Sequence, residues 1–105
     1  MNAYIYKSDL HCEFCGAKLS LNGKEHYLKG PYPNGGGESD SPQHCGTCGL
    51  FLENPLTEDG EMYVQSAYDD LTGVLLVEKS RLETINQWVT FYEYLDLANI
   101  GEGPY

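Results

Sequence analysis

The four cysteines constrain the fold more than any other feature, because they form two pairs with two residues between the partners. Such a spacing allows a tight turn that points both thiolates at one ion, and a glycine after each pair permits the positive φ that this turn needs. Two such turns facing each other supply four thiolates in a tetrahedron. We therefore predict a metal site made by Cys12, Cys15, Cys45 and Cys48, with Gly16 and Gly49 completing the turns.

We predict that the ion is zinc in a closed, structural site, since four thiolates complete its coordination. Met1–Tyr6 has no basic segment followed by an apolar one, so we expect no secretory signal, a cytoplasmic protein, and no disulfide framework. His11 and His44 each precede a cysteine pair. Whether either histidine replaces a cysteine ligand stays open, and so does iron in place of zinc.

The stretch from Cys12 to Gly49 resembles rubredoxin in its paired C-x-x-C-G turns separated by 29 residues. This resemblance implies an alternative function, that of a small iron electron carrier using the same cysteines. The sequence departs from the family before Cys45, where Pro42-Gln43-His44 replaces the usual aromatic and aliphatic residues. It also continues for 56 residues beyond Gly49.

A further alternative is a small zinc enzyme of the nucleobase-deaminase type. His11-Cys12-Glu13 matches H-x-E and Cys45 to Cys48 matches C-x-x-C, and Glu13 would be the base beside an open zinc position. Pro42 stands three residues before Cys45 instead of next to it, and Cys15 would have no role. We favour a non-catalytic protein and predict no catalytic residues.

Negative charge is concentrated in residues 50–105, which hold eleven carboxylates against Lys79 and Arg81 and so carry −9 of the chain's −10. This excess disfavours direct binding of nucleic acid and favours a protein partner with a basic surface. We expect the interaction residues to be acidic side chains of the second half, namely Glu58, Asp59, Glu61, Asp69 and Asp70. A solvated helix surface is the alternative interpretation. No apolar run reaches the ~18–20 residues of a membrane span, so we expect no membrane partner.

The patterning predicts an α+β fold, with zinc-ribbon-like β hairpins and two C-terminal α-helices. We expect a metal-binding portion over 1–56, an acidic helical portion over 57–100 packed on it within a single domain, and a flexible tail over 101–105. In the first half, strands are predicted at 3–6 and 25–28, a hairpin turn at Asn22-Gly23, and a loop at 30–37.

Two amphipathic helices are predicted in the second half. Thr57 is a candidate N-cap for the first helix, which should end at Gly73. Residues 74–77 are either a strand or the start of the next helix. Ser80 and Glu83 form a candidate capping box for the second helix. The apolar positions at helical spacing are Val64, Ala67, Tyr68 and Leu71 in the first helix and Leu82, Ile85, Trp88, Val89, Tyr92 and Leu95 in the second.

Residues 29–57 contain the string G-P-Y-x-x-G-G-G-E at 30–38. With the segment 3–6 and the first cysteine pair, they resemble a group of small uncharacterised proteins of bacteria and their phages. The resemblance implies a link to mobile elements and carries over no catalytic residue. Together with the charge, it leads to the hypothesis of a zinc-stabilised interaction module. In that hypothesis a phage or mobile element encodes an inhibitor that binds the basic surface of a nucleic-acid-binding protein by charge mimicry, in the host cytoplasm.

Overall fold

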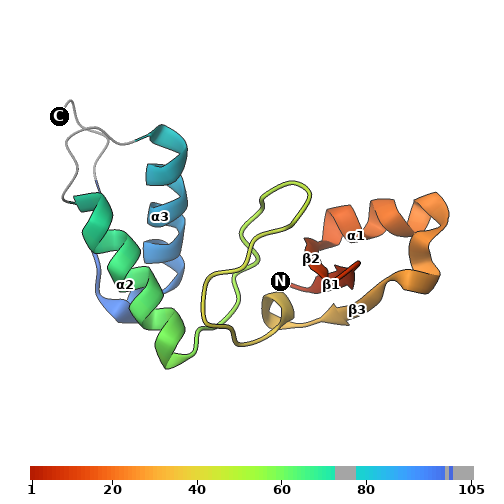
Figure 1. Ribbon diagram of the computed structural model, residues 1–105, viewed down its shortest axis with the longest axis horizontal. Helices are drawn as coiled ribbons and strands as arrows, with labels where there is room; N and C mark the ends of the chain where they lie inside the picture. Colours follow the sequence, from red (N-terminus) through yellow and green to blue (C-terminus); the bar gives the residue numbers. More distant parts are fainter. Residues whose placement is uncertain (73–77, 99, 101–105) are drawn as a thin grey trace.

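The computed structural model describes residues 1–72, 78–98 and 100, and it has the α+β architecture predicted from the sequence. Its sheet is antiparallel, with the strand order β2-β1-β3. The strands are β1 (Ala3–Tyr6), β2 (Asp9–Cys12) and β3 (Lys29–Tyr32). The predicted strand at 3–6 is therefore confirmed, and it is the central strand (Figure 1).

A two-residue turn of Lys7 and Ser8 joins β1 to β2, and both residues adopt positive φ, of 50° and 67°. The hairpin register pairs Ala3 with Cys12 and Tyr6 with Asp9. Because Ala3 is fully buried and pairs with Cys12, the first cysteine is fixed at the buried end of the hairpin.

Residues 13–28 differ from the prediction. They form the helix α1 (Glu13–Leu19), a π-helical turn η1 (Ser20–Lys24) and a 3₁₀ turn η2 (Glu25–Tyr27). The hairpin turn at 22–23 and the strand at 25–28 were therefore wrong. The strand begins four residues later and covers the start of the predicted loop at 30–37. β3 is an edge strand, which is why it tolerates Pro31 within it.

The segment 37–57 crosses the middle of the molecule with two isolated β-bridges, Ser39 to Leu56 and His44 to Phe51. Asn54 is its central side chain and is fully buried. The Asn54 amide accepts a hydrogen bond of 2.7 Å from the Gln43 backbone N–H and donates to the carbonyls of Ser41 and Pro55. One side chain thus replaces much of the hydrogen bonding that a regular element would supply.

The helices α2 (Glu58–Thr72) and α3 (Lys79–Phe91) form the second half, followed by the 3₁₀ turn η4 (Glu93–Leu95). The Thr57 hydroxyl accepts a hydrogen bond of 3.1 Å from the Gly60 N–H, which confirms Thr57 as an N-cap. Both predicted apolar stripes face one core, which also includes Phe51 and Leu56 of the crossing segment. Its members from the two helices and the C-cap residue of α3 are Val64, Leu71, Leu82, Ile85, Trp88, Val89 and Tyr92, with Ala67, Tyr68 and Leu95 packed at its edge.

The capping box was wrong, because α3 begins at Lys79 and Glu78 is its N-cap residue. Ser80 thus lies inside the first turn, where its carbonyl accepts a hydrogen bond from the Thr84 hydroxyl. The predictions for Gly73, for residues 74–77 and for the tail 101–105 fall outside the described residues.

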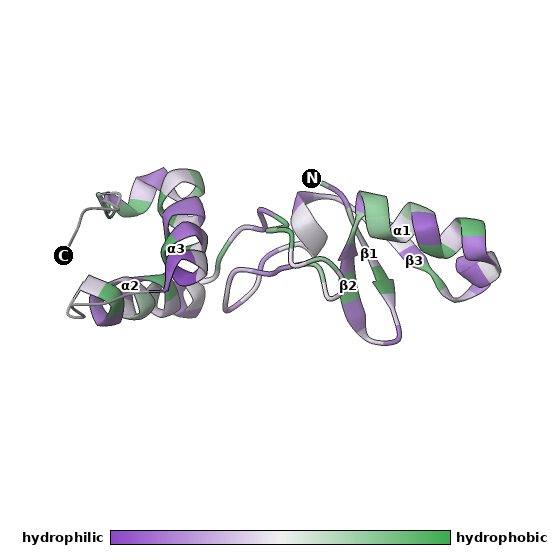
Figure 2. Ribbon diagram, turned by 90° about the horizontal axis from the view of Figure 1, so that it is seen from above, coloured by the Kyte–Doolittle hydropathy of each residue, from purple (hydrophilic) through white to green (hydrophobic). Residues whose placement is uncertain are grey.

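The molecule is elongated, measuring 48 × 28 × 18 Å along its principal axes. The sheet and α1 lie at one end, α2 and α3 lie at the other, and the segment 37–57 lies between them (Figures 1 and 2). A second core of Ala3, Cys12, Cys15, Cys45 and Leu52 occupies the sheet end. No helix among the described residues is long and apolar enough to cross a bilayer.

Candidate metal centre

The first cysteine pair lies where β2 passes into α1. Cys12 is the N-cap residue of α1, and its Sγ accepts a hydrogen bond of 3.4 Å from the Cys15 backbone N–H. Cys15 follows in the first helical turn, so both thiols point to the same side. The positive φ expected at Gly16 was wrong, because Gly16 lies within α1. It is needed there for space instead, since a Cβ would lie 2.6 Å from the Tyr4 ring.

The second pair lies in a tight turn closed by backbone hydrogen bonds. The Gly49 N–H donates to the Cys45 carbonyl and the Cys45 N–H donates to the Leu50 carbonyl, at 2.9 and 2.8 Å. Gly49 has φ 78°, as the spacing predicts. The Thr47 N–H lies 3.5 Å from the Cys45 Sγ, so this sulfur also accepts a backbone hydrogen bond.

The two pairs face each other because the Gly46 N–H donates a hydrogen bond of 2.8 Å to the Leu10 carbonyl of β2. The Sγ atoms of Cys12, Cys15, Cys45 and Cys48 all lie within 4.8 Å of one another, and those of Cys12 and Cys48 are 3.6 Å apart. A tetrahedron with Zn–S bonds of about 2.3 Å has an S–S edge of about 3.8 Å. The four cysteines are thus arranged to hold a metal ion.

The ionisation of the cluster also fits a cation. Burial and then hydrogen bonds with the neighbouring thiols raise the pKa of Cys15 to about 12. Burial opposes ionisation of Cys45 as well, but backbone hydrogen bonds to its sulfur lower its pKa to about 5. Four sulfurs this close cannot all become thiolates without a positive charge between them. A divalent ion held by these four sulfurs would supply that charge and displace the remaining protons.

Both histidines lie outside the four-sulfur group. His11 is buried, and its Nδ1 lies 3.1 Å from the Thr47 hydroxyl. His44 uses both ring nitrogens: Nδ1 donates to the Gly49 carbonyl at 2.9 Å, and Nε2 accepts from the Trp88 indole N–H at 3.0 Å. The histidines therefore support the second turn through hydrogen bonds, His11 at Thr47 and His44 at Gly49.

Sequence reasoning missed Asn54 and the pairing of His44 with Trp88. Asn54 precedes a proline, and Asn-Pro is typical of an ordinary turn. No local pattern signals its burial or the hydrogen bond that its carbonyl accepts from the Tyr92 hydroxyl. These contacts join the crossing segment to α3 and to its C-cap residue Tyr92 over a separation of at least 38 residues.

The predicted interaction residues lie in two groups on α2. Glu58, Asp59 and Glu61 are in its first turn, where Glu61 is half-buried and the other two are exposed. Asp69 and Asp70 are exposed near its other end, about 16 Å away along the helix axis.

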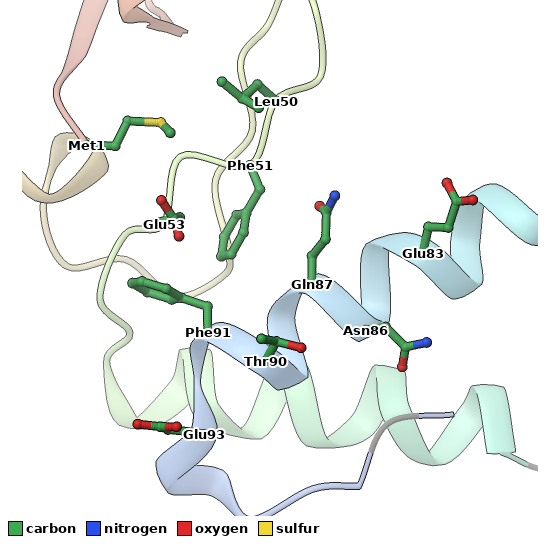
Figure 3. Close-up of a pocket in the computed structure, with 10 residues that line it drawn as sticks. All are labelled: Met1, Leu50, Phe51, Glu53, Glu83, Asn86, Gln87, Thr90, Phe91 and Glu93. Atoms are coloured by element: carbon green, nitrogen blue, oxygen red, sulfur yellow. The ribbon is translucent and has the colours of Figure 1, made fainter. Parts of the chain in front are cut away.

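An open groove of about 820 Å³ lies between the segment 50–53 and α3 (Figure 3). Its lining includes the carboxylates of Glu53, Glu83 and Glu93 and the partly exposed apolar side chains of Leu50 and Phe91. No cationic side chain is among the described residues that line it.

Comparisons of the chain with protein-family models, with curated proteins and with solved structures find no match.

Proposed function

We propose that this protein is a non-catalytic interaction module in which structural zinc fixes the sheet end and the acidic helical end binds a basic surface of a partner protein. An inhibitor that imitates the charge of nucleic acid is the concrete form of this function, encoded by a phage or mobile element and acting in the host cytoplasm. The observation that carries the proposal is the unneutralised carboxylate surface of the helical end. Within the described residues the only ion pair is Lys79 with Glu83, at 4.0 Å.

Zinc is supported by the closed set of four sulfurs and by the two backbone hydrogen bonds to them. The ion would tie the β2–α1 junction to the Cys45–Cys48 turn, so its role is to hold the fold. Iron suits the same sulfurs, and partial exposure of Cys48 is the feature that favours a rubredoxin-like electron carrier as second candidate.

Metal analysis with a visible spectrum, on protein purified without added metal and kept reduced, separates the two candidates. We expect one equivalent of zinc and no colour. One equivalent of iron, with thiolate charge-transfer bands and a reversible potential, would favour electron transfer instead.

The groove between residues 50–53 and α3 supports direct contact with a partner in addition to long-range electrostatic attraction. Glu53, Glu83 and Glu93 provide carboxylates, while Leu50 and Phe91 provide apolar surface. A lysine or arginine side chain has a charged head and an aliphatic stem, so it matches both parts of this lining. Charge over α2 would steer the partner, and the groove would receive one basic side chain.

The interaction is tested by displacement of a labelled DNA duplex from purified nucleic-acid-binding proteins of the host, followed by fluorescence anisotropy at low salt. We expect displacement by the wild-type protein. The triple variant D59K/D69K/D70K should need at least tenfold more protein for the same displacement.

The matched control is D9K/E13K/E25K, which makes the same charge change at the sheet end and should keep the wild-type effect. If both variants displaced DNA equally poorly, the effect would be due to the net charge of the protein alone. Failure of the wild-type protein to displace DNA from any of these proteins would contradict the proposal.

A further inference from the structure

A second pocket, of about 610 Å³, is lined by residues of the sheet end. This end lies opposite the acidic helices (Figure 1). The β1–β2 turn forms one side of it, and the segment from η1 to β3 forms the other. Lys7 comes from the turn, while Lys24 and Lys29 come from the segment. Tyr6, His26 and Tyr27 also line the pocket.

The pocket gathers half of the chain's six cations, although the chain carries sixteen carboxylates. None of the three lysines has a carboxylate within 4.0 Å among the described residues. Asp9 and Glu25 are close in sequence but do not line the pocket. Three lysines around one cavity repel one another, and an anion placed between them would relieve that repulsion.

The turn that carries Lys7 has an unfavourable backbone conformation. Positive φ at both positions of a two-residue turn favours Asn-Gly, yet the sequence has Lys7 and Ser8 there. The Lys7 Nζ lies 5.5 Å from the centre of the Tyr6 ring, at the edge of the pocket. The turn therefore presents a cation to the cavity at a conformational cost, which is a pattern found at binding sites.

Aromatic surface accompanies the cations. The Tyr27 side chain is 70% exposed although it lines the pocket, and His26 lies beside it. Exposed aromatic rings next to lysines suit a ligand that joins a planar ring to anionic groups.

We propose that this pocket binds a nucleoside di- or triphosphate, with the phosphates among Lys7, Lys24 and Lys29 and the base stacked on Tyr27. A cavity of this size suits one nucleotide. A long nucleic acid is disfavoured, because the chain as a whole carries −10 and would repel its phosphates. This inference does not depend on the function proposed for the acidic end.

The test is isothermal titration calorimetry, in which ATP is added to the metal-loaded protein at low salt and without added divalent cation. We expect one binding site. The variant K24A/K29A should bind ATP at least tenfold more weakly and Y27S at least threefold more weakly, whereas Y27F should stay within twofold of wild type. K18A removes an exposed lysine that lies outside the pocket, so it should also stay within twofold.

Three further ligands decide the chemistry of the site. Adenosine and inorganic triphosphate should each bind at least fivefold more weakly than ATP, since each lacks one half of the ligand. Equal binding of ATP and triphosphate would overturn the nucleotide assignment in favour of a simple anion site. Tighter binding of an oligothymidylate than of ATP, an equal effect of K18A and K24A/K29A, or no binding at millimolar ATP would overturn the proposal.

Discussion

The indole N–H of Trp88 donates a hydrogen bond of 3.0 Å to Nε2 of His44, and this contact fastens α3 to the turn that holds Cys45 and Cys48. The His44 ring also packs against Phe51, with 5.3 Å between the ring centroids. The candidate metal centre and the helical core are therefore joined through one side chain that is not itself in the four-sulfur group.

We expect His44→Ala to lower the free energy of unfolding by about 1–3 kcal/mol, because it leaves the Trp88 indole N–H without its acceptor. Urea denaturation of the metal-loaded protein measures this change. The exposed His26 offers a control, and His26→Ala should alter stability by less than about 0.5 kcal/mol. Metal content should remain at one equivalent in both variants. A free energy of unfolding that His44→Ala leaves unchanged would contradict the structural role of the contact with Trp88.

Removal of the metal should loosen the two ends unequally. The sheet-end core contains three of the four cysteines and little else, whereas the helical core is larger and contains none of them. After chelation under reducing conditions, hydrogen exchange should accelerate strongly over residues 3–52 and less over α2 and α3. Cys45→Ser should reproduce this pattern without a chelator. Uniform acceleration along the chain would show that the metal supports both ends equally.

Alkaline pH should destabilise the protein through Tyr92. Burial, followed by the nearby Tyr94 and Glu53 charges, raises the pKa of Tyr92 above its ordinary value of 10. The folded state therefore favours the neutral phenol, and its stabilising contribution is complete below pH 10 and is lost as pH rises above it. We expect a constant free energy of unfolding from pH 7 to 9 and a fall beyond 10, measured with the metal bound.

Tyr92→Phe should show a smaller alkaline fall. It should also be less stable at pH 8 by about 1–3 kcal/mol, because the Asn54 carbonyl loses its donor. The exposed Tyr27 is the control, and Tyr27→Phe should keep the wild-type profile. An unchanged alkaline fall in Tyr92→Phe would exclude Tyr92 as its cause.

The two acidic groups of α2 should differ in their effect on stability. Asp70 lies near the C-terminal end, where the helix dipole disfavours negative charge, and Asp59 lies in the first turn, where the dipole favours it. Asp70→Lys should raise the free energy of unfolding by about 0.3–1 kcal/mol, and Asp59→Lys should lower it by a similar amount. Both positions are exposed, so the pair controls for net charge. A higher free energy of unfolding in both variants would mean that repulsion among the carboxylates outweighs the effect of the helix dipole.

The parts of the fold that were predicted correctly depend on local patterns. The spacing of the cysteines brings each pair together within one turn, and helical periodicity identifies the apolar faces of α2 and α3. The predictions from the sequence were wrong where two local signals competed. The segment from Cys12 to Gly16 reads as a metal-binding turn, yet Cys12 caps a helix that includes Gly16. Glu25–Leu28 reads as a strand by composition, while the pairing with β1 selects Lys29–Tyr32.

The remaining features depend on the path of the segment 37–57, which no periodicity describes. Burial of Asn54 and the contact of His44 with Trp88 exist only once that path is fixed. Gly35 illustrates the same point, because a Cβ at this residue would lie 2.2 Å from the Leu52 carbonyl oxygen. The closeness of these two backbones has no signature in either stretch of sequence.

Charge is distributed unevenly along the 48 Å axis, so the molecule has an electric dipole moment along that axis. Residues 1–37 carry four lysines and three carboxylates, a net charge of +1, while residues 50–105 carry −9. Opposite ends of such a rod are pulled differently by an external field, so the field of a basic surface exerts a torque on the approaching protein. Near such a surface the protein would therefore rotate before contact, with its helices in front and its lysine end behind.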